Sequence, residues 1–290
     1  MNDLNRPQRP ALQLQLGPRL WQPRTPVVMG IVNVTPDSFS DGGQFQQRDA
    51  AVARALQLHA EGAGVIDLGG ESTRPGAQPV SPAEELARVL PVVQALAAQP
   101  GLVLSIDTSS PEVFAACWAV TPCLWNDVRA LTRPGARALA ARLDCPVVLM
   151  HNRGEPDRMG ELTDYPQGVV DTVCAELQQQ VALACAAGVR PAQMILDPGF
   201  GLFAKTTAQN LQLLAHLPAL QALGHPLLIG LSRKHMLGEV LGGAPVDQRV
   251  HAGVAAAVWA VSQGAVLVRT HDVAPTVQAL RLLQAVQDHF

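Results

Sequence analysis

Residues 102–127 read LVLSIDTSSPEVFAACWAVTPCLWND, and this stretch contains a complete strand–helix–strand repeat. Residues 102–106 form a short apolar run of the kind that makes a buried parallel strand. Ser110-Pro111-Glu112 then opens a helical segment with an N-cap serine, a proline in the first turn and a nearby acidic side chain. Residues 122–125 form the next apolar run. This order predicts two parallel strands joined by a crossover helix.

The same repeat extends along the whole chain. Apolar runs that are followed by helical spacing occupy residues 27–32, 64–68, 102–106, 122–125, 146–150, 193–196, 226–231 and 264–268. The predicted helices at 50–61, 171–187 and 251–263 each end at a glycine, a common helix stop. Eight strands alternating with helices in 290 residues predict the α/β class and a single (β/α)₈ TIM-barrel domain over residues 1–290. A doubly wound parallel sheet is the alternative.

A short segment precedes the first strand of the predicted barrel. Residues 12–16 alternate between Leu and Gln and then meet Gly17-Pro18, a turn signal. We expect a short N-terminal hairpin that covers the lower end of the barrel.

Composition limits the class of protein. The net charge of −3 and the pI of about 6.2 argue against nucleic acid as a partner. No apolar run is long enough for a transmembrane helix, and residues 1–25 do not resemble a signal peptide. The five cysteines include no Cys-x-x-Cys pair, so we expect neither a zinc site nor a disulfide framework, and we expect a cytoplasmic location.

Polar residues follow every predicted strand, at the end where a barrel of this kind carries its active site. They are Asn33, the segment 71–74, Asp107, Asn126-Asp127, His151-Asn152, Asp197, Ser232-Arg233-Lys234 and the segment 269–272. One such residue alone is more often a cap than a catalyst, but eight together indicate a site. The carboxylates and amides suit a polar heterocycle, and the basic side chains suit phosphate.

The basic residues at these ends are Arg74, Arg233, Lys234, Arg269 and His271. Gathered at one mouth of a negatively charged protein, they predict a local anion site. The alternative is that an arginine, Arg233 above all, pairs with a neighbouring carboxylate. Residues 34–43 and 72–80 are rich in Gly, Pro, Ser and Asp, and we expect them to form loops that close over a ligand.

The motifs at these strand ends resemble those of the dihydropteroate synthase family. The long matches are MGIVNVTPDSFSDGG at residues 29–43 and GAGVIDLGGESTRPGA at residues 62–77. The shorter ones are SIDTS at 105–109, NDV at 126–128, LMH at 149–151, LDPGFG at 196–201, SRK at 232–234 and RTHD at 269–272. The resemblance covers almost the whole chain.

The resemblance implies roles for matching residues. Thr73, Asp107, Asn126, Asp197, Lys234, Arg269 and His271 would hold a pterin diphosphate. Asn33 would bind the cofactor Mg²⁺ through its side-chain oxygen. The p-aminobenzoate pocket would contain Arg74, Pro75, Phe203, Lys234 and His235. A homodimer through the last helices is also implied.

The resemblance further implies substitution at the pterin methylene, with the diphosphate leaving and the amine of p-aminobenzoate attacking. Asp107 would stabilise the pterin cation, and Arg269 and His271 would stabilise the leaving diphosphate. The catalytic residues would then be Asp107, Lys234, Arg269 and His271. Asp197 and Asn126 would bind the amino-pyrimidinone edge of the pterin.

The chain departs from the family pattern at three places. Arg153 and Arg158 are basic where the family is not, and His235 replaces a small hydroxyl residue. One residue is extra between Gly201 and Lys205. We expect it to turn an apolar side chain toward the p-aminobenzoate pocket, unless the bulge points to solvent.

Two other functions are compatible with parts of this pattern. A pterin-dependent methyltransferase domain shares the barrel and the pterin-binding carboxylates. A catalytically weak pterin-binding paralogue would keep the site without turnover. The first motif and the SRK segment favour a synthase.

Overall fold

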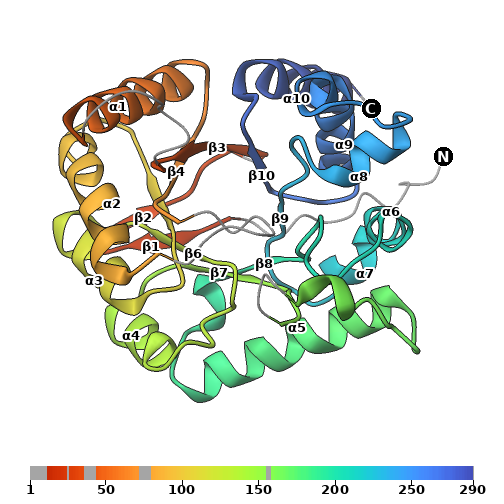
Figure 1. The fold of residues 1–290 in the computed structure, drawn as a ribbon, viewed down its shortest axis with the longest axis horizontal. Coiled ribbons are helices and arrows are strands. Elements are labelled where there is room, and N and C mark those ends of the chain that lie inside the picture. The colour runs from red at the N-terminus through yellow and green to blue at the C-terminus, as the bar shows by residue number, and fades with distance from the viewer. Residues whose placement is uncertain (1–11, 25, 36–43, 72–79, 155–157, 290) are drawn as a thin grey trace.

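The computed structural model describes residues 12–24, 26–35, 44–71, 80–154 and 158–289 (Figure 1). Its strands are β1 (Leu14–Leu16), β2 (Arg19–Trp21), β3 (Val27–Asn33), β4 (Val65–Gly69), β5 (Leu104–Asp107), β6 (Leu124–Asp127), β7 (Val147–Met150), β8 (Met194–Asp197), β9 (Leu228–Ile229) and β10 (Leu267–Thr270). Its α-helices are α1 (Gln44–Ala60), α2 (Pro82–Leu96), α3 (Pro111–Val120), α4 (Ala136–Leu143), α5 (Val169–Ala186), α6 (Thr207–Ala215), α7 (Leu217–Gln221), α8 (His235–Val240), α9 (Val250–Ser262) and α10 (Val273–Gln287). Short 3₁₀ turns are η2 (Met159–Glu161), η3 (Pro191–Gln193) and η4 (Val246–Arg249).

The last eight strands form one parallel sheet that closes on itself. The strand order is β8-β7-β6-β5-β4-β3-β10-β9, and a parallel bridge between Leu196 and Leu227 joins the two ends. The helices surround this ring of strands (Figure 1). Neighbours in the ring are neighbours in the chain, which a doubly wound sheet would not give. The predicted (β/α)₈ barrel is confirmed.

Local signals place the helix ends where the sequence predicts them. Ser81 Oγ accepts from the backbone N–H of Glu84 at 3.2 Å and so caps α2. Ser110 caps α3 in the same way. Gly62, Gly188 and Gly264 have φ values of +107°, +97° and +104°, which side chains with a Cβ rarely adopt. Helix α1 begins at Gln44, before the predicted residue 50. The prediction starts too late because the first residues of the helix are mostly polar and carry no apolar periodicity.

The strand bounds differ from the prediction in an informative way. Asp107, Asn126 and Asp197 lie within the strands rather than after them. The predicted strand at 226–231 shrinks to two residues, because the ladder with β10 contains only Leu228 and Ile229 before the chain turns away.

The N-terminal hairpin covers one end of the barrel, as predicted. Strands β1 and β2 pair antiparallel around Gly17. Leu12, Leu14 and Trp21 pack in one buried cluster with interior residues from the amino halves of the strands, such as Val65 and Leu124. This apolar plug closes the amino end and leaves the carboxyl end for polar side chains.

Side chains alternate along each strand between the barrel interior and the surrounding helices. On β4, Ile66 and Leu68 pack in the outer core, whereas Val65 joins the interior cluster and Asp67 lies one step above it. By this alternation, the polar side chains at the carboxyl end of the interior are those of Asn33, Asp67, Asp107, Asn126, Asp197 and Arg269. In the described parts of the chain, no helix has both the length and the apolar character needed to cross a bilayer.

Candidate active site

A buried ion-pair cluster occupies the carboxyl end of the barrel. Arg269 Nε donates to Asp67 Oδ2 at 2.6 Å, and Arg269 Nη2 donates to Asp107 Oδ2 at 2.6 Å. The Asn126 side-chain N–H donates to Asp67 Oδ2 at 3.1 Å. These contacts join β4, β5, β6 and β10, so four strands orient one set of polar groups.

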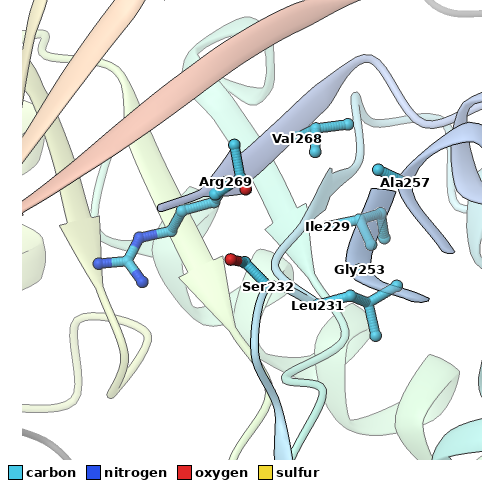
Figure 2. Close-up of a pocket in the computed structure, with 8 residues that line it drawn as sticks. Ile229, Leu231, Ser232, Gly253, Ala257, Val268 and Arg269 are labelled. Carbon is cyan, nitrogen blue, oxygen red and sulfur yellow. The ribbon is translucent and has the colours of Figure 1, made fainter. Parts of the chain in front are cut away.

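The alternation along β10 explains why Arg269 reaches this cluster. Figure 2 shows Val268 on the side of Ala257 and Gly253, whereas the Arg269 side chain extends in the opposite direction. Leu267 and Val268 pack in the interior and outer clusters respectively. Arg269, two residues after Leu267, therefore points into the barrel.

Burial changes the acid–base properties of the carboxylates. It raises the pKa of Asp107 to about 7. The positive charge of Arg269 lowers this pKa and offsets only part of the effect of burial, and the nearby carboxylate of Asp67 raises it further. Burial also raises the pKa of Asp197, against a 2.7 Å hydrogen bond from the Gly199 N–H. Burial opposes the charge of Arg269, but Asp67 and Asp107 outweigh it and raise the pKa of Arg269.

Asp67 is a site residue that the sequence analysis missed. It is fully buried, and its Oδ1 atom has no hydrogen-bond partner among the described residues. An unpartnered buried carboxylate oxygen can accept a hydrogen bond from a ligand. The predicted site residues follow the apolar runs, whereas Asp67 lies inside one. The available signal was a carboxylate two residues after Val65, on the interior side of the strand.

Phe203 and Lys234 form a second wall of the site. Lys234 Nζ lies 4.8 Å from the centre of the Phe203 ring, a cation–π contact. A Cβ on Gly201 would lie 3.0 Å from Lys234 Cδ, so the lysine stem passes close over this glycine. The extra residue of this loop exposes Leu202, whose accessibility is 46%, while Phe203 faces Lys234. For Leu202, the solvent-facing alternative is the one that holds.

The predicted anion site is smaller than the sequence suggests. Arg233 forms a two-bond ion pair with Asp272, at 3.1 and 2.6 Å, so the alternative of a structural pair is confirmed for this arginine. His271 Nδ1 lies 3.1 Å from Ser232 Oγ, and the His271 backbone N–H donates to the same oxygen. Ser232 thus holds the imidazole near Asp272.

The remaining predicted residues divide into three groups. A Cβ on Gly69 would lie 3.9 Å from Asn33 Oδ1 and 3.7 Å from Asp107 Oδ2, so both oxygens adjoin this glycine. His235 instead pairs with Glu239 one turn along α8 at 3.2 Å, with half of its side chain exposed. Thr73, Arg74, Pro75 and most of both predicted loops lie outside the described residues.

The chain is similar to known proteins over most of its length. A family model described as "Pterin binding enzyme" matches residues 29–271. The chain is 46% identical to the dihydropteroate synthase of Escherichia coli K12 over 264 residues, which is 90% of this chain and 91% of the other. It also resembles the solved structure of Xanthomonas albilineans dihydropteroate synthase with 4-aminobenzoic acid, at 49% identity and a TM-score of 0.89, covering 96% of this chain and 98% of that one.

A second Xanthomonas albilineans structure, in complex with 7,8-dihydropteroate, has a TM-score of 0.85 and 47% identity over 95% of this chain and 98% of its own. The sequence identity is high over nearly the full length of both aligned chains, so the similarity includes more than the barrel fold. The chain therefore belongs to the pterin-binding enzyme family, among the dihydropteroate synthases.

Proposed function

We propose that this chain joins (7,8-dihydropterin-6-yl)methyl diphosphate to p-aminobenzoate and releases 7,8-dihydropteroate and diphosphate. The observation that carries the proposal is the cluster of Asp67, Asp107, Asn126 and Arg269 at the carboxyl end of the barrel, close to Asp197. Related structures that contain 4-aminobenzoic acid and 7,8-dihydropteroate support the same substrates.

Asp197 and Asn126 would bind the pterin. A carboxylate accepts two parallel N–H bonds from an amino-pyrimidinone edge, and an amide can donate and accept. The 2.7 Å bond from Gly199 fixes one oxygen of Asp197 in place. This arrangement would select a heterocycle that has adjacent N–H donors.

Asp107 would stabilise the reacting centre. The C–O bond to the diphosphate breaks, its electron pair leaves with the diphosphate, and positive charge spreads over the pterin. The amine nitrogen of p-aminobenzoate then bonds to the methylene carbon and loses a proton to solvent. Arg269 holds the Asp107 carboxylate in one orientation, so the negative charge is in place before the cation forms.

We expect kcat to rise with pH through about 7. The pKa of Asp107 is raised to about 7, and only its ionised form stabilises the cation. The rate should therefore be low at pH 6 and level off above pH 8. Single-turnover rates at saturating substrates measure this rise with pH, and the rise should be absent from Asp107→Asn. A flat profile in the unmodified protein would exclude this role for Asp107.

The diphosphate would lie toward Lys234, Arg269 and His271, and Thr73 would also bind it. Asn33 would contribute its side-chain oxygen to Mg²⁺, because hard cations take oxygen ligands and the Asn33 and Asp107 oxygens adjoin the same glycine. Among the described residues, no group of three or more His, Cys, Asp or Glu side chains could hold a metal ion. An ion held by Asn33 would supply positive charge that neutralises the leaving diphosphate.

Asn33→Ala should raise the Mg²⁺ concentration required for half-maximal activity on the order of tenfold, the effect of losing about one ligand contact. Titration of activity with Mg²⁺ at saturating substrates measures the shift. The Michaelis constant for p-aminobenzoate serves as the internal control and should not change. An unaltered Mg²⁺ requirement would remove Asn33 from the metal site.

The p-aminobenzoate pocket would include Phe203 and Lys234, with Arg74 and Pro75 completing it. The Lys234 ammonium beside the flat Phe203 ring suits an aromatic carboxylate. The pairing of His235 with Glu239 leads us to leave His235 out of this pocket.

One assay separates the proposed function from its alternatives. Mg²⁺-dependent release of diphosphate from the pterin diphosphate is measured with and without p-aminobenzoate, and dihydropteroate is quantified. A synthase releases diphosphate and forms dihydropteroate in equal amounts. A weak paralogue or a methyltransferase domain would bind the pterin and form no dihydropteroate.

We further propose that the protein acts in the cytoplasm as a homodimer that pairs through its last helices. Trp259 on α9 and Leu282 and Val286 on α10 are exposed apolar side chains, 48%, 67% and 47% accessible, and an interface would cover them. Sedimentation equilibrium gives the mass in solution, and a monomer at micromolar concentration would exclude the dimer.

A further inference from the structure

Lys205 is a buried cation with no role in the reaction proposed above. Its residue accessibility is 2%, and Nζ lies 2.9 Å from His151 Nδ1, 3.0 Å from the Gly199 carbonyl oxygen and 3.0 Å from the Phe203 carbonyl oxygen. An ammonium group has three donors, so these three acceptors use all of them. The chain contains only two lysines among its 21 Lys and Arg residues, Lys205 and Lys234, and both lie in this region.

The hydrogen bonds beyond Lys205 run through His151 to Glu176, which also accepts from Arg153 on its other side. Burial, followed by the charge of Lys205, lowers the pKa of His151 to about 4, so the imidazole is neutral near pH 7. Because Nδ1 accepts from Lys205, the proton of the neutral ring is on Nε2, which lies 2.7 Å from Glu176 Oε2. Arg153 Nε donates to both oxygens of Glu176 at 3.1 Å.

These groups converge on one loop, residues 199–204. Lys205 binds the carbonyl oxygens of Gly199 and Phe203, and Tyr165 OH donates to the Ala204 carbonyl oxygen at 3.0 Å. Arg153 stacks on the Tyr165 ring, 4.1 Å from its centre. Ala204 has a φ of +59°, a conformation that a non-glycine residue keeps only when its surroundings impose it.

We propose that Lys205, His151, Glu176 and Arg153 form a positioning network that fixes this loop and thereby sets the Phe203 wall of the p-aminobenzoate pocket. The inference rests on the function proposed above, because it assigns a task within that pocket. Lys205 acts through Phe203 and is therefore a positioning residue. A Met side chain at residue 205 would fill the same space but donate no hydrogen bond.

The burial of Lys205 makes the network sensitive to pH. Burial lowers the pKa of Lys205 to about 7; Asp197 and Glu176 act against this shift, and Arg153 and Lys234 add to it. The neighbouring His151 is neutral in this range. A neutral amine has two N–H donors for three acceptors, two of which lie on the loop, so one of the three contacts weakens as the pH rises above about 7.

The kinetic test compares the Michaelis constants of both substrates. Lys205→Met should raise the constant for p-aminobenzoate about tenfold, and that for the pterin diphosphate less than threefold, because the loop contacts and not the pterin ligands are lost. Glu176→Gln, which removes a charge remote from the substrates, should raise the Michaelis constant for p-aminobenzoate about threefold. Asp171→Asn removes the same charge from an exposed position on α5 and serves as the matched control, with no expected change.

In the unmodified protein, the constant for p-aminobenzoate should also rise several-fold between pH 6.5 and 8.5, and this rise should be absent from Lys205→Met. Equal increases for both substrates in Glu176→Gln would indicate a general structural role and overturn the proposal. Unchanged constants in both variants would overturn it as well.

A second readout requires no substrate. Protein labelled with [¹³Cε]lysine should give two lysine signals, and Lys205→Met identifies one of them. We expect that signal to titrate near pH 7, lower in Glu176→Gln and unchanged in Asp171→Asn. A midpoint near 10, the value of a solvated lysine, or no response to Glu176→Gln, would overturn the network. Failure to form dihydropteroate would instead reject the proposed function alone.

Discussion

Arg269→Met is expected to lower the free energy of unfolding by about 3–5 kcal/mol, the usual cost of removing one partner from a buried ion pair. Arg269 pairs with Asp67 and Asp107, and Asp67 is fully buried. Without the guanidinium, two adjacent carboxylates remain in a region of low polarity, and at least one must take up a proton. Urea denaturation at pH 7 measures the loss.

The double variant Arg269→Met with Asp67→Asn provides the control. Asparagine removes one of the two unpaired charges, so the double variant should recover a substantial part of the lost stability. It should nevertheless remain inactive, since Asp107 would no longer be oriented by a cation. A single variant that is destabilised by less than about 1 kcal/mol would show that solvent already screens the cluster.

Asp197→Asn is expected to weaken binding of a pterin by more than about 2 kcal/mol, or roughly thirtyfold in Kd. The amide group replaces an acceptor oxygen by a donor. One side of it would then face either the Gly199 N–H, which donates to Asp197 at 2.7 Å, or the N–H groups of the pterin. Either arrangement sets two donors against each other.

Isothermal titration calorimetry with a pterin that lacks the diphosphate isolates this effect from the phosphate contacts. Asp144→Asn is the matched control, because Asp144 forms an exposed ion pair with Arg190 away from the site. Equal affinity of the Asp197→Asn variant and the unmodified protein would end the assignment of Asp197 as the pterin anchor.

The barrel was predictable because its signals are local. Apolar runs, Ser-Pro helix starts such as Ser110-Pro111 and glycine stops such as Gly62 act within a few residues of each other. Strand lengths were less predictable. Where β9 ends depends on the register with β10, which a linear pattern does not contain.

The candidate site was predictable in its members and less so in its pairings. Polar residues at strand ends must meet at one mouth of a barrel, so Asp107, Asn126, Asp197 and Arg269 were found from their positions alone. That Arg233 would pair with Asp272, and that His235 would pair with Glu239, depended on side-chain directions that strand order does not specify.

The barrel, the family and most of the polar residues at its mouth follow from the order of residues, because strand periodicity and motifs are properties of neighbouring residues. Only the tertiary structure brought Arg269 to Asp67, which is 202 positions away in the chain, and Lys205 to His151 and Gly199. These contacts form where separate strands and loops share a buried space of low dielectric. There the partners of each charge are decided by distance and desolvation, which depend on the closed barrel and not on the order of residues.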